Sequence, residues 1–525
     1  MKNMLKTFIP VFHSKARLKS LYPHGAVCGA ILLALFLSFT NIDARSLWFD
    51  EAYSVGLTAL DWSVFQAILI NHEANMGLYS VLLKVWVGIM GSSEYSVRSL
   101  SALTAVGSVP ILYLIGCRLF NTRVGITAAL LLAANPFFIR YSQEARSYSL
   151  VLFLVSLAGY FFLRFVDAPS AKNRAIYICA TVLAAYSHFF ALLIPVCHAA
   201  SLPLMKQKAV RLLNITLTFS IIGVPVLPLI VFILAKDSGQ VSWIPPVDLL
   251  SLPRLFFAFS GLVDLPMVIV CLLLFPIGLF NLLQKSWKQP LSRKTWQSGF
   301  TVIWLVLPIA IVMIVSLLKP LFVTRYFIVS FPPFILITSL GLACITRKWN
   351  YRLCTAVVVI LSSNAVFTSY RASTVADWKS ASSFLFSSSL SNDALFIHRD
   401  TQFIPYAYYK EKLSGQRLPP ECFYPTTPLR NLFMDSGASP PDRQHIKSLL
   451  EKRDRAWLII CEDTPERLFG FLSLFGTNLH PVPLSGKRPE NRQGATLRDN
   501  IRTLYRYHRE WQFERIRLYL FYNET

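Results

Sequence analysis

The chain has 525 residues, of which 54% are hydrophobic and only 15% are charged, whereas an ordinary soluble domain has roughly 25% charged residues. This balance excludes a soluble globular protein. The formal net charge of +23 does not indicate nucleic-acid binding, because the basic residues fall in short clusters between apolar runs and not in one patch or stripe.

Apolar runs near the roughly 20 residues that a bilayer core requires recur along the chain. The first run has no small-residue cleavage pattern after it, so we expect a retained helix and not a secretory signal. The runs predict eleven membrane-spanning helices, at residues 25–40, 97–119, 124–140, 148–166, 174–187, 189–205, 212–235, 265–283, 299–318, 327–346 and 353–369. The fifth and sixth require a turn at Ser187-His188-Phe189. If these two segments formed a single tilted helix, every later span would cross the membrane in the opposite direction.

Lysine and arginine indicate the orientation, since short basic loops stay in the cytoplasm. With the N-terminus inside, every predicted inner loop is basic. The acidic residues of the membrane part all fall outside except Asp167. Acids contribute little to topology, so their gathering favours a functional site on the outer face. We therefore expect a multi-pass protein of the inner (plasma) membrane with an extracytoplasmic active site.

Two outer segments stand apart from the predicted spans. The first, residues 41–96, contains Leu78–Met90, an apolar stretch of interfacial or re-entrant length. The second is the polar tail after residue 370. The predicted organisation is a cytoplasmic N-terminus, a multi-span membrane domain and an extracytoplasmic C-terminal domain, at residues 1–24, 25–370 and 371–525.

Within the tail, short apolar runs predict buried strands and helical spacing predicts helices in alternation, which is typical of a small α/β domain. The strands are expected at Ala394–Ile397 and Ala456–Cys461, and the helices at Trp378–Phe386 and His445–Lys452. The alternative is a partly disordered basic extension, since Pro481–Arg502 is polar and rich in turn residues.

The nine cysteines show no metal-binding spacing, and seven of them lie in or beside apolar segments. Only Cys422 and Cys461 lie in the polar tail. They can pair if the tail faces an oxidising compartment, although the sequence does not fix their distance.

The first outer loop has the strongest local chemistry. Asp50 and Glu51 follow Trp48-Phe49, and a tryptophan ring is typical of the membrane surface. Adjacent side chains point in different directions, so one carboxylate can act as a general base while the other binds or orients another group. The alternative is the start of a helix, where acids are favourable near the dipole. Glu73 can place a third carboxylate at the same depth.

Basic residues are scarce on the predicted outer side, and two of them lie at helix ends. Arg146 and Arg325 can each bind a phosphate through two hydrogen bonds. The alternative for each is an arginine that reaches the lipid headgroups. Glu144 is also placed to pair with Arg140, four residues before it on one helix face.

Four ordered motifs resemble glycosyltransferase family 39, which includes protein O-mannosyltransferases, lipid A aminoarabinose transferases and related bacterial sugar transferases. The motifs are Leu47-Trp48-Phe49-Asp50-Glu51, Glu73-Ala74-Asn75-Met76 with Leu78-Tyr79, Tyr141 to Tyr148 (YSQEARSY), and Arg325-Tyr326-Phe327 before Pro332-Pro333. The likeness covers roughly residues 30–370. It extends faintly to Asp377-Trp378-Lys379 in the tail. It implies the helical polytopic GT-C fold, with eleven spans, the N-terminus inside and the C-terminus outside.

The resemblance also implies a reaction, in which a sugar moves with inversion from a polyprenyl-phosphate-linked donor to an extracytoplasmic acceptor, such as a cell-envelope lipid, glycan or protein. Asp50 becomes the expected base, supported by Glu51. The expected phosphate-binding residues are Arg146, Arg325, Tyr326, Gln143 and Glu144. Glu73 and His188 are candidate ligands for a divalent metal ion. Many relatives have Pro-Pro before Leu-Tyr where this chain has Met76-Gly77, which weakens the assignment of Glu73.

Two other function classes remain open from the sequence. A transporter or flippase of lipid-linked sugars is also polytopic, but its ionisable residues should lie near the midplane on broken helices. A non-catalytic membrane scaffold predicts no converging acids and arginines. The depth of the charged residues distinguishes these classes from an enzyme.

Overall fold

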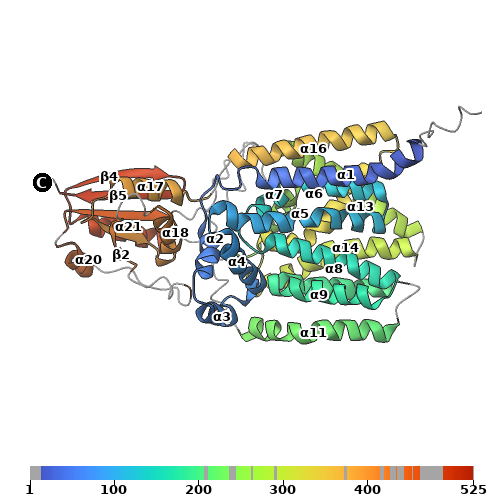
Figure 1. Cartoon of the computed structure of the whole chain (residues 1–525), viewed down its shortest axis with the longest axis horizontal. Helices are drawn as coiled ribbons and strands as arrows, with labels where there is room; N and C mark the ends of the chain where they lie inside the picture. Colours follow the sequence, from blue (N-terminus) through green and yellow to red (C-terminus); the bar gives the residue numbers. More distant parts are fainter. Residues whose placement is uncertain are drawn as a thin grey trace, which may run out of the picture.

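A computed structural model describes most of the chain. The described residues are 14–205, 211–235, 244–261, 264–288, 292–371, 375–413, 419–425, 433, 443–451, 453–461 and 489–523. Long helices form a bundle along the longest axis of the molecule, and a smaller part with a β-sheet lies at one end of it (Figure 1). The predicted N-terminal segment 1–24 falls mostly outside the described residues.

Every predicted span coincides with helix in the structure, but not every one is long and apolar enough to cross a membrane alone. Seven stretches of the described chain pass that test: α5 (Glu94–Leu119), α8 (Tyr148–Asp167), α11 (Leu212–Ala235), α13 (Leu265–Lys288) over its first 20 residues, α14 (Arg293–Ser316), the 3-10 helix η5 (Thr324–Ser330) joined to α15 (Phe331–Ala343), and α16 (Lys348–Arg371) up to Tyr370. If a bent pair of helices is counted as one span, the described chain has up to eight candidate spans.

The remaining three of the eleven predicted spans do not pass that test within the described residues. They correspond to α1 (Ser14–Phe39), which enters the test only as Pro23–Phe39, to α9 (Ala171–Ser187), and to the chain of η2 (Phe189–Leu192), α10 (Leu193–Ser201) and η3 (Leu202–Leu204). The turn predicted at Ser187-His188-Phe189 is present, because α9 ends there and η2 begins. Length and composition alone therefore support fewer spans than we predicted.

The run predicted as one span over residues 124–140 is broken. α6 (Thr122–Ala134) and α7 (Pro136–Ser142) meet at an angle of 58°. Pro136 has no backbone N–H and opens α7, while the Asn135 side chain accepts hydrogen bonds from the backbone N–H groups of Phe137 and Phe138. This cap ends one helix and starts the next within a single apolar run.

The first outer loop is largely helical and lies at the end of the bundle that faces the sheet (Figure 1). It contains α2 (Phe49–Thr58), α3 (Trp62–Asn71), the 3-10 helix η1 (Ala74–Met76) and α4 (Gly77–Met90). The expected apolar stretch Leu78–Met90 is thus the short helix α4. Between α11 and α13 the chain adds α12 (Ser251–Ser260).

The polar tail forms the predicted α/β structure, with a mixed five-stranded sheet in the order β2-β1-β3-β5-β4. Both predicted strands, β1 (Ala394–His398) and β3 (Arg455–Cys461), are present and pair in parallel. The sheet also contains β2 (Glu421–Tyr424), β4 (Tyr507–Phe513) and β5 (Ile516–Tyr522), with helices α17 (Trp378–Ser388), η6 (Asp400–Gln402), α18 (Phe403–Leu413), α20 (Arg443–Leu450) and α21 (Pro489–Arg502). Part of the stretch proposed as disordered is therefore helical, and its residues 481–488 lie outside the described residues.

The two cysteines of the tail do not pair. Cys422 lies on β2 and Cys461 ends β3, and both are free thiols. β1 lies between these strands, and two strand spacings place the cysteines about 9–10 Å apart at least. A disulfide requires Cα atoms within about 7 Å.

The tail holds the segment that precedes α2. The Ser46 hydroxyl donates to the Asp377 carboxylate over 2.8 Å and accepts from the Lys379 backbone N–H. The Leu47 backbone N–H donates to the Tyr409 hydroxyl over 2.8 Å. The motif Asp377-Trp378-Lys379 therefore docks onto the first outer loop.

An ion cluster marks the opposite end of the bundle. The Asp167 carboxylate lies 2.8 Å from the guanidinium groups of both Arg118 and Arg293. Asp167, Arg118 and Arg293 belong to three different predicted inner segments. The single acid that we expect inside therefore forms ion pairs with two arginines at the same end of the bundle. The arrangement agrees with the predicted alternation of loops, whichever side of the membrane this end faces.

Candidate active site at the helix ends

One carboxylate lies between two arginines at the end of the bundle beside the tail. Asp50 Oδ2 is 3.9 Å from Arg146 Nη2 and 3.7 Å from Arg325 Nη2. Each of the three side chains is at most one-fifth exposed. The residues come from sequence positions far apart, and the structure brings together the acid and both arginines that the sequence predicted.

Local structure positions each of these side chains. Asp50 is the second residue of α2, Arg146 lies in the short segment between α7 and α8, and Arg325 is in the 3-10 helix η5. Arg146 Nη1 donates to the Asp50 carbonyl oxygen over 3.3 Å and to the Ser54 hydroxyl over 3.0 Å. The Arg325 guanidinium lies over the Trp48 ring, 5.4 Å from its centroid. Burial lowers the pKa of Arg146, but Asp50, Tyr148 and Glu73 together outweigh this effect, so the net shift is upward.

Glu51 is completely buried and forms an ion pair that the sequence did not reveal. Arg98 Nε and Nη2 donate to the two Glu51 oxygens over 2.8 and 2.7 Å, and the Ala145 backbone N–H also donates to Oε1. Arg98 is only 2% exposed and also donates to the carbonyl oxygens of Ile42, Arg45 and Ser46. Glu51 thus fastens the start of α2 to α5 and to the segment before Arg146. An arginine in an apolar helix needs a buried partner, and this was the signal available in the sequence.

The side chains of Gln143 and Glu144 lie beside the site and contact other groups of the protein. The Gln143 side-chain amide donates to the carbonyl oxygens of Leu37, Ser38 and Thr40, and its oxygen accepts from Arg45. It therefore joins the end of α1 to this region. Glu144 Oε1 is 3.5 Å from Arg140 Nε, which is the alternative ion pair that the spacing indicated. Burial raises the pKa of Glu144 to about 7 against the opposing effect of Arg140.

Aromatic rings and His188 form one wall of the site. The His188 ring lies 4.7 Å from the Tyr326 ring and 6.2 Å from the Tyr148 ring, measured between centroids. His188 Nδ1 accepts a hydrogen bond from the Phe190 backbone N–H over 3.2 Å. Burial and the charges of Arg146 and Arg325 lower the pKa of His188 to about 3. This histidine is therefore neutral and close to both arginines.

Glu73 lies next to Tyr53, and its charge also acts on Arg146. Burial raises the pKa of the Tyr53 hydroxyl, and Glu73 raises it further through its charge and a hydrogen bond. Glu73 and His188 do not fit the predicted metal site. The His188 nitrogen that accepts from Phe190 has no lone pair left, and the other nitrogen must then carry the proton. Within the described residues no three His, Cys, Asp or Glu side chains gather as ligands.

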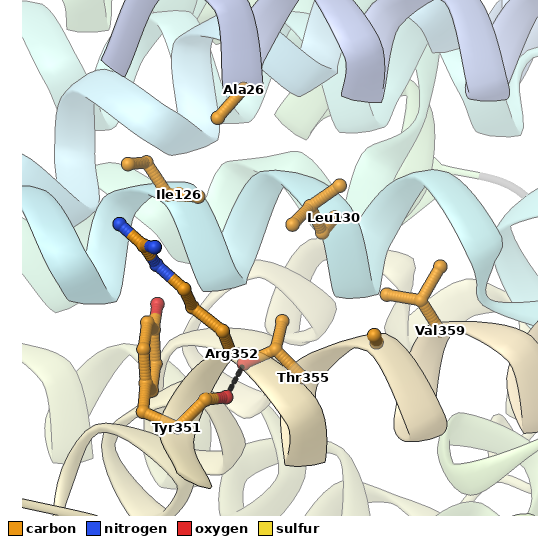
Figure 2. Close-up of a pocket in the computed structure, with 8 residues that line it drawn as sticks. Ala26, Ile126, Leu130, Tyr351, Arg352, Thr355 and Val359 are labelled. Carbon is orange, nitrogen blue, oxygen red and sulfur yellow. Dashed lines mark hydrogen bonds between the residues drawn. The ribbon is translucent and has the colours of Figure 1, made fainter. Parts of the chain in front are cut away.

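A cavity of about 290 Å³ lies elsewhere, between α1, α6 and α16 (Figure 2). Its walls are mostly apolar and include Ile126, Leu130 and Val359, together with the Arg352 side chain. These residues lie toward the helix ends remote from Asp50, because α6 and α16 both begin there. The cavity therefore takes no part in the site.

Comparisons with known proteins agree on the family and the fold. Residues 76–235 match the family model described as dolichyl-phosphate-mannose-protein mannosyltransferase. No curated protein sequence matches the chain. Among solved structures, ArnT from Cupriavidus metallidurans bound to undecaprenyl phosphate superposes with a TM-score of 0.58 at 13% identity, over 94% of this chain and 98% of that one.

Two further structures show the same likeness. ArnT from Cupriavidus metallidurans in the apo state gives a TM-score of 0.56 at 14% identity, over 86% of this chain and 95% of that one. The Archaeoglobus fulgidus oligosaccharyltransferase tethered to an acceptor peptide gives 0.54 at 12% identity, over 85% of this chain and 70% of that one. Residues 76–235 therefore match this mannosyltransferase family, and the chain has the GT-C fold of these membrane glycosyltransferases.

Proposed function

We propose that this protein transfers a sugar from a polyprenyl-phosphate-linked donor to a hydroxyl group of an extracytoplasmic acceptor, with inversion at the anomeric carbon. The observation that carries the proposal is the position of the Asp50 carboxylate between the guanidinium groups of Arg146 and Arg325. A base beside two phosphate-binding groups is the arrangement that this reaction needs. The undecaprenyl phosphate bound to ArnT supports a lipid phosphate as the donor's carrier.

In the proposed step the acceptor oxygen attacks the anomeric carbon on the face opposite the phosphate. A carbon–oxygen bond forms to the acceptor as the carbon–oxygen bond to the phosphate breaks, and the bonding electrons leave with the phosphate oxygen. Asp50 takes the acceptor proton. Arg146 and Arg325 stabilise the charge that grows on the departing polyprenyl phosphate.

The free site is arranged so that donor binding can release the base. The contacts between Asp50 and the two arginines are 3.7 and 3.9 Å long, beyond the range of a good hydrogen bond. A phosphate that enters between the arginines would compete with Asp50 for their N–H groups. The carboxylate then faces the acceptor with fewer competing contacts.

The depth of the charges favours transfer over transport. The ion pairs described in the helical part lie in loops or near helix ends: Asp50, Glu51 and Glu144 with their arginines at one end, and Asp167 with its two arginines at the other. A transporter would be expected to place such groups near the membrane midplane on broken helices. The bent pair α6 and α7 has Arg123 in its first turn and Arg140 in its last turn, and no charged residue between them.

The arginines provide a direct test of the phosphate assignment. Arg146→Ala and Arg325→Ala should each reduce transfer by about 10²–10³-fold, which is typical for the loss of one preorganised charge-stabilising donor. Arg254→Ala is the control, because Arg254 pairs with Asp248 outside the site, over 2.8 Å. The measurement is release of labelled undecaprenyl phosphate from undecaprenyl-phosphate sugars by purified protein. Equal and mild effects at all three positions would refute the assignment.

We also propose that the site and the tail face the outside of the plasma membrane, with domain limits at residues 1–24, 25–370 and 371–525. The basic loops at the Asp167 end support this orientation. Reporters fused after Asp43 and after Arg371 should both report the outer side, and a reporter placed after Lys288 should report the cytoplasm. A cytoplasmic signal from the fusion after Arg371 would overturn the orientation.

A further inference from the structure

Several buried groups beside the arginines have no hydrogen-bond partner among the described residues, and His188 Nε2 and the Tyr148 hydroxyl are two of them. His188 is 3% exposed and Tyr148 is fully buried. A buried polar group without a partner costs roughly 1–3 kcal/mol, so two such groups at one site require an explanation. A ligand that accepts hydrogen bonds would supply the missing partner.

The geometry fixes which kind of ligand His188 can bind. Its Nδ1 accepts from the Phe190 backbone N–H, so the ring proton of the neutral imidazole is on Nε2. Nε2 is then a hydrogen-bond donor and has no lone pair for a metal ion. The Tyr148 hydroxyl can donate as well. Both groups belong to the same aromatic wall, with ring centroids 6.2 Å apart.

We propose that His188 Nε2–H and the Tyr148 hydroxyl donate hydrogen bonds to the phosphate of the lipid-linked donor, as neutral partners of Arg146 and Arg325. This inference rests on the proposed function and deepens it. A donor phosphodiester carries one negative charge, and the departing polyprenyl phosphate gains a second as the carbon–oxygen bond breaks. Neutral donors aimed at that oxygen stabilise the product-like charge without increasing the repulsion between the two guanidinium groups.

The low pKa of His188, about 3, supports this role. A histidine that acted as a cation or as a proton carrier would lose or gain its function between pH 5 and 8. His188 stays neutral over that whole range, since its pKa lies below it. Its contribution to phosphate binding should therefore not change between pH 5 and 8.

Two substitutions of His188 distinguish the proposed hydrogen-bond donor, Nε2–H, from the helix cap that Nδ1 provides for η2. In His188→Asn the shorter side chain can still accept from the Phe190 N–H, but it does not reach the position of Nε2. In His188→Gln the longer side chain brings an amide N–H near that position. We expect His188→Asn to weaken binding of undecaprenyl phosphate by about 10-fold or more, and His188→Gln to retain most of it.

His198→Asn is the matched control. His198 is also fully buried, with Nε2 unpartnered among the described residues and Nδ1 bonded to a side chain, the Tyr177 hydroxyl. The His198 ring packs in the bundle against the rings of Phe162 and Phe300, at centroid distances of 4.4 and 5.6 Å. The substitution His198→Asn should not change the affinity for undecaprenyl phosphate. Tyr148→Phe, which removes one oxygen and keeps the ring, is a second test and should weaken binding like His188→Asn.

The experiment measures binding of undecaprenyl phosphate to the purified full chain by native mass spectrometry, at pH 5 and pH 8 and with or without a chelator. Unchanged binding by both His188→Asn and Tyr148→Phe would overturn the proposal, as would binding by the wild type that depends on added divalent metal. Failure of the wild type to bind undecaprenyl phosphate at all would instead contradict the proposed function itself. Loss in the two variants with retention in His188→Gln supports the donor role.

Discussion

Asp50→Asn is expected to lower sugar transfer by about 10²–10⁴-fold, which is the usual contribution of a positioned general base. An acceptor hydroxyl is a poor nucleophile at neutral pH, and the amide keeps the shape of the carboxylate while losing its basicity. Transfer should be measured from a labelled polyprenyl-phosphate sugar by purified protein.

Binding of the lipid phosphate by Asp50→Asn should be unchanged or tighter. The substitution removes a negative charge from between Arg146 and Arg325, which lie 3.9 and 3.7 Å from the carboxylate, and an incoming phosphate no longer competes with it. Asp43→Asn is the matched control, because Asp43 is an exposed acid of the same loop, and it should transfer normally. Near-normal transfer by Asp50→Asn would remove Asp50 as the base.

Arg98→Met is expected to destabilise the protein by about 3–5 kcal/mol, the cost of leaving one member of a buried ion pair without its partner. The Glu51 carboxylate, 1% exposed, would keep only the Ala145 N–H and the weaker N–H of Trp48 as donors. The loop from Ile42 to Ser46 would also lose three hydrogen bonds to its carbonyl oxygens. The measurement is thermal unfolding of the full chain in one detergent.

Arg293→Gln is the control for that measurement. Arg293 is 62% exposed and shares Asp167 with Arg118, so its loss should cost no more than about 1 kcal/mol. The double change Arg98→Met with Glu51→Leu should recover part of the lost stability, because it leaves no unpaired buried charge. Equal unfolding temperatures for Arg98→Met and Arg293→Gln would contradict the structural role of this pair.

The resemblance implied that Glu51 supports Asp50, and the structure indicates how. Glu51 holds the first turn of α2 through Arg98 and through the backbone of Ala145, next to Arg146. It thereby fixes the distance between the proposed base and one of the proposed phosphate-binding groups. We assign it a positioning role, whereas Asp50 alone of the adjacent pair lies against both arginines of the site.

The tail adds a second constraint on the same loop. Its hydrogen bonds to Ser46 and Leu47 come from Asp377, Lys379 and Tyr409. These residues lie more than 300 positions away in the chain. The C-terminal part therefore positions the start of α2, in addition to any role in acceptor binding.

The sequence alone determined which segments are apolar enough for helices, because hydrophobic length depends on consecutive residues. It also predicted Asp50, Arg146 and Arg325 as site candidates, since basic residues are scarce on the predicted outer side. The same local signals indicated β1 and β3 in the tail. They did not reveal the break at Asn135-Pro136, where a side-chain cap and a missing N–H bend the chain by 58° within one apolar run.

Only the tertiary structure decided how the polar side chains are partnered. Arg98 and Glu51 are 47 positions apart, and Gln143 reaches carbonyl oxygens more than 100 positions away, so no local pattern could pair them. The same applies to His188, whose Nδ1 accepts from the Phe190 N–H while Nε2 has no partner among the described residues. Hydrogen bonds act over about 3 Å, and the sequence does not contain the distances between segments that meet only in the fold.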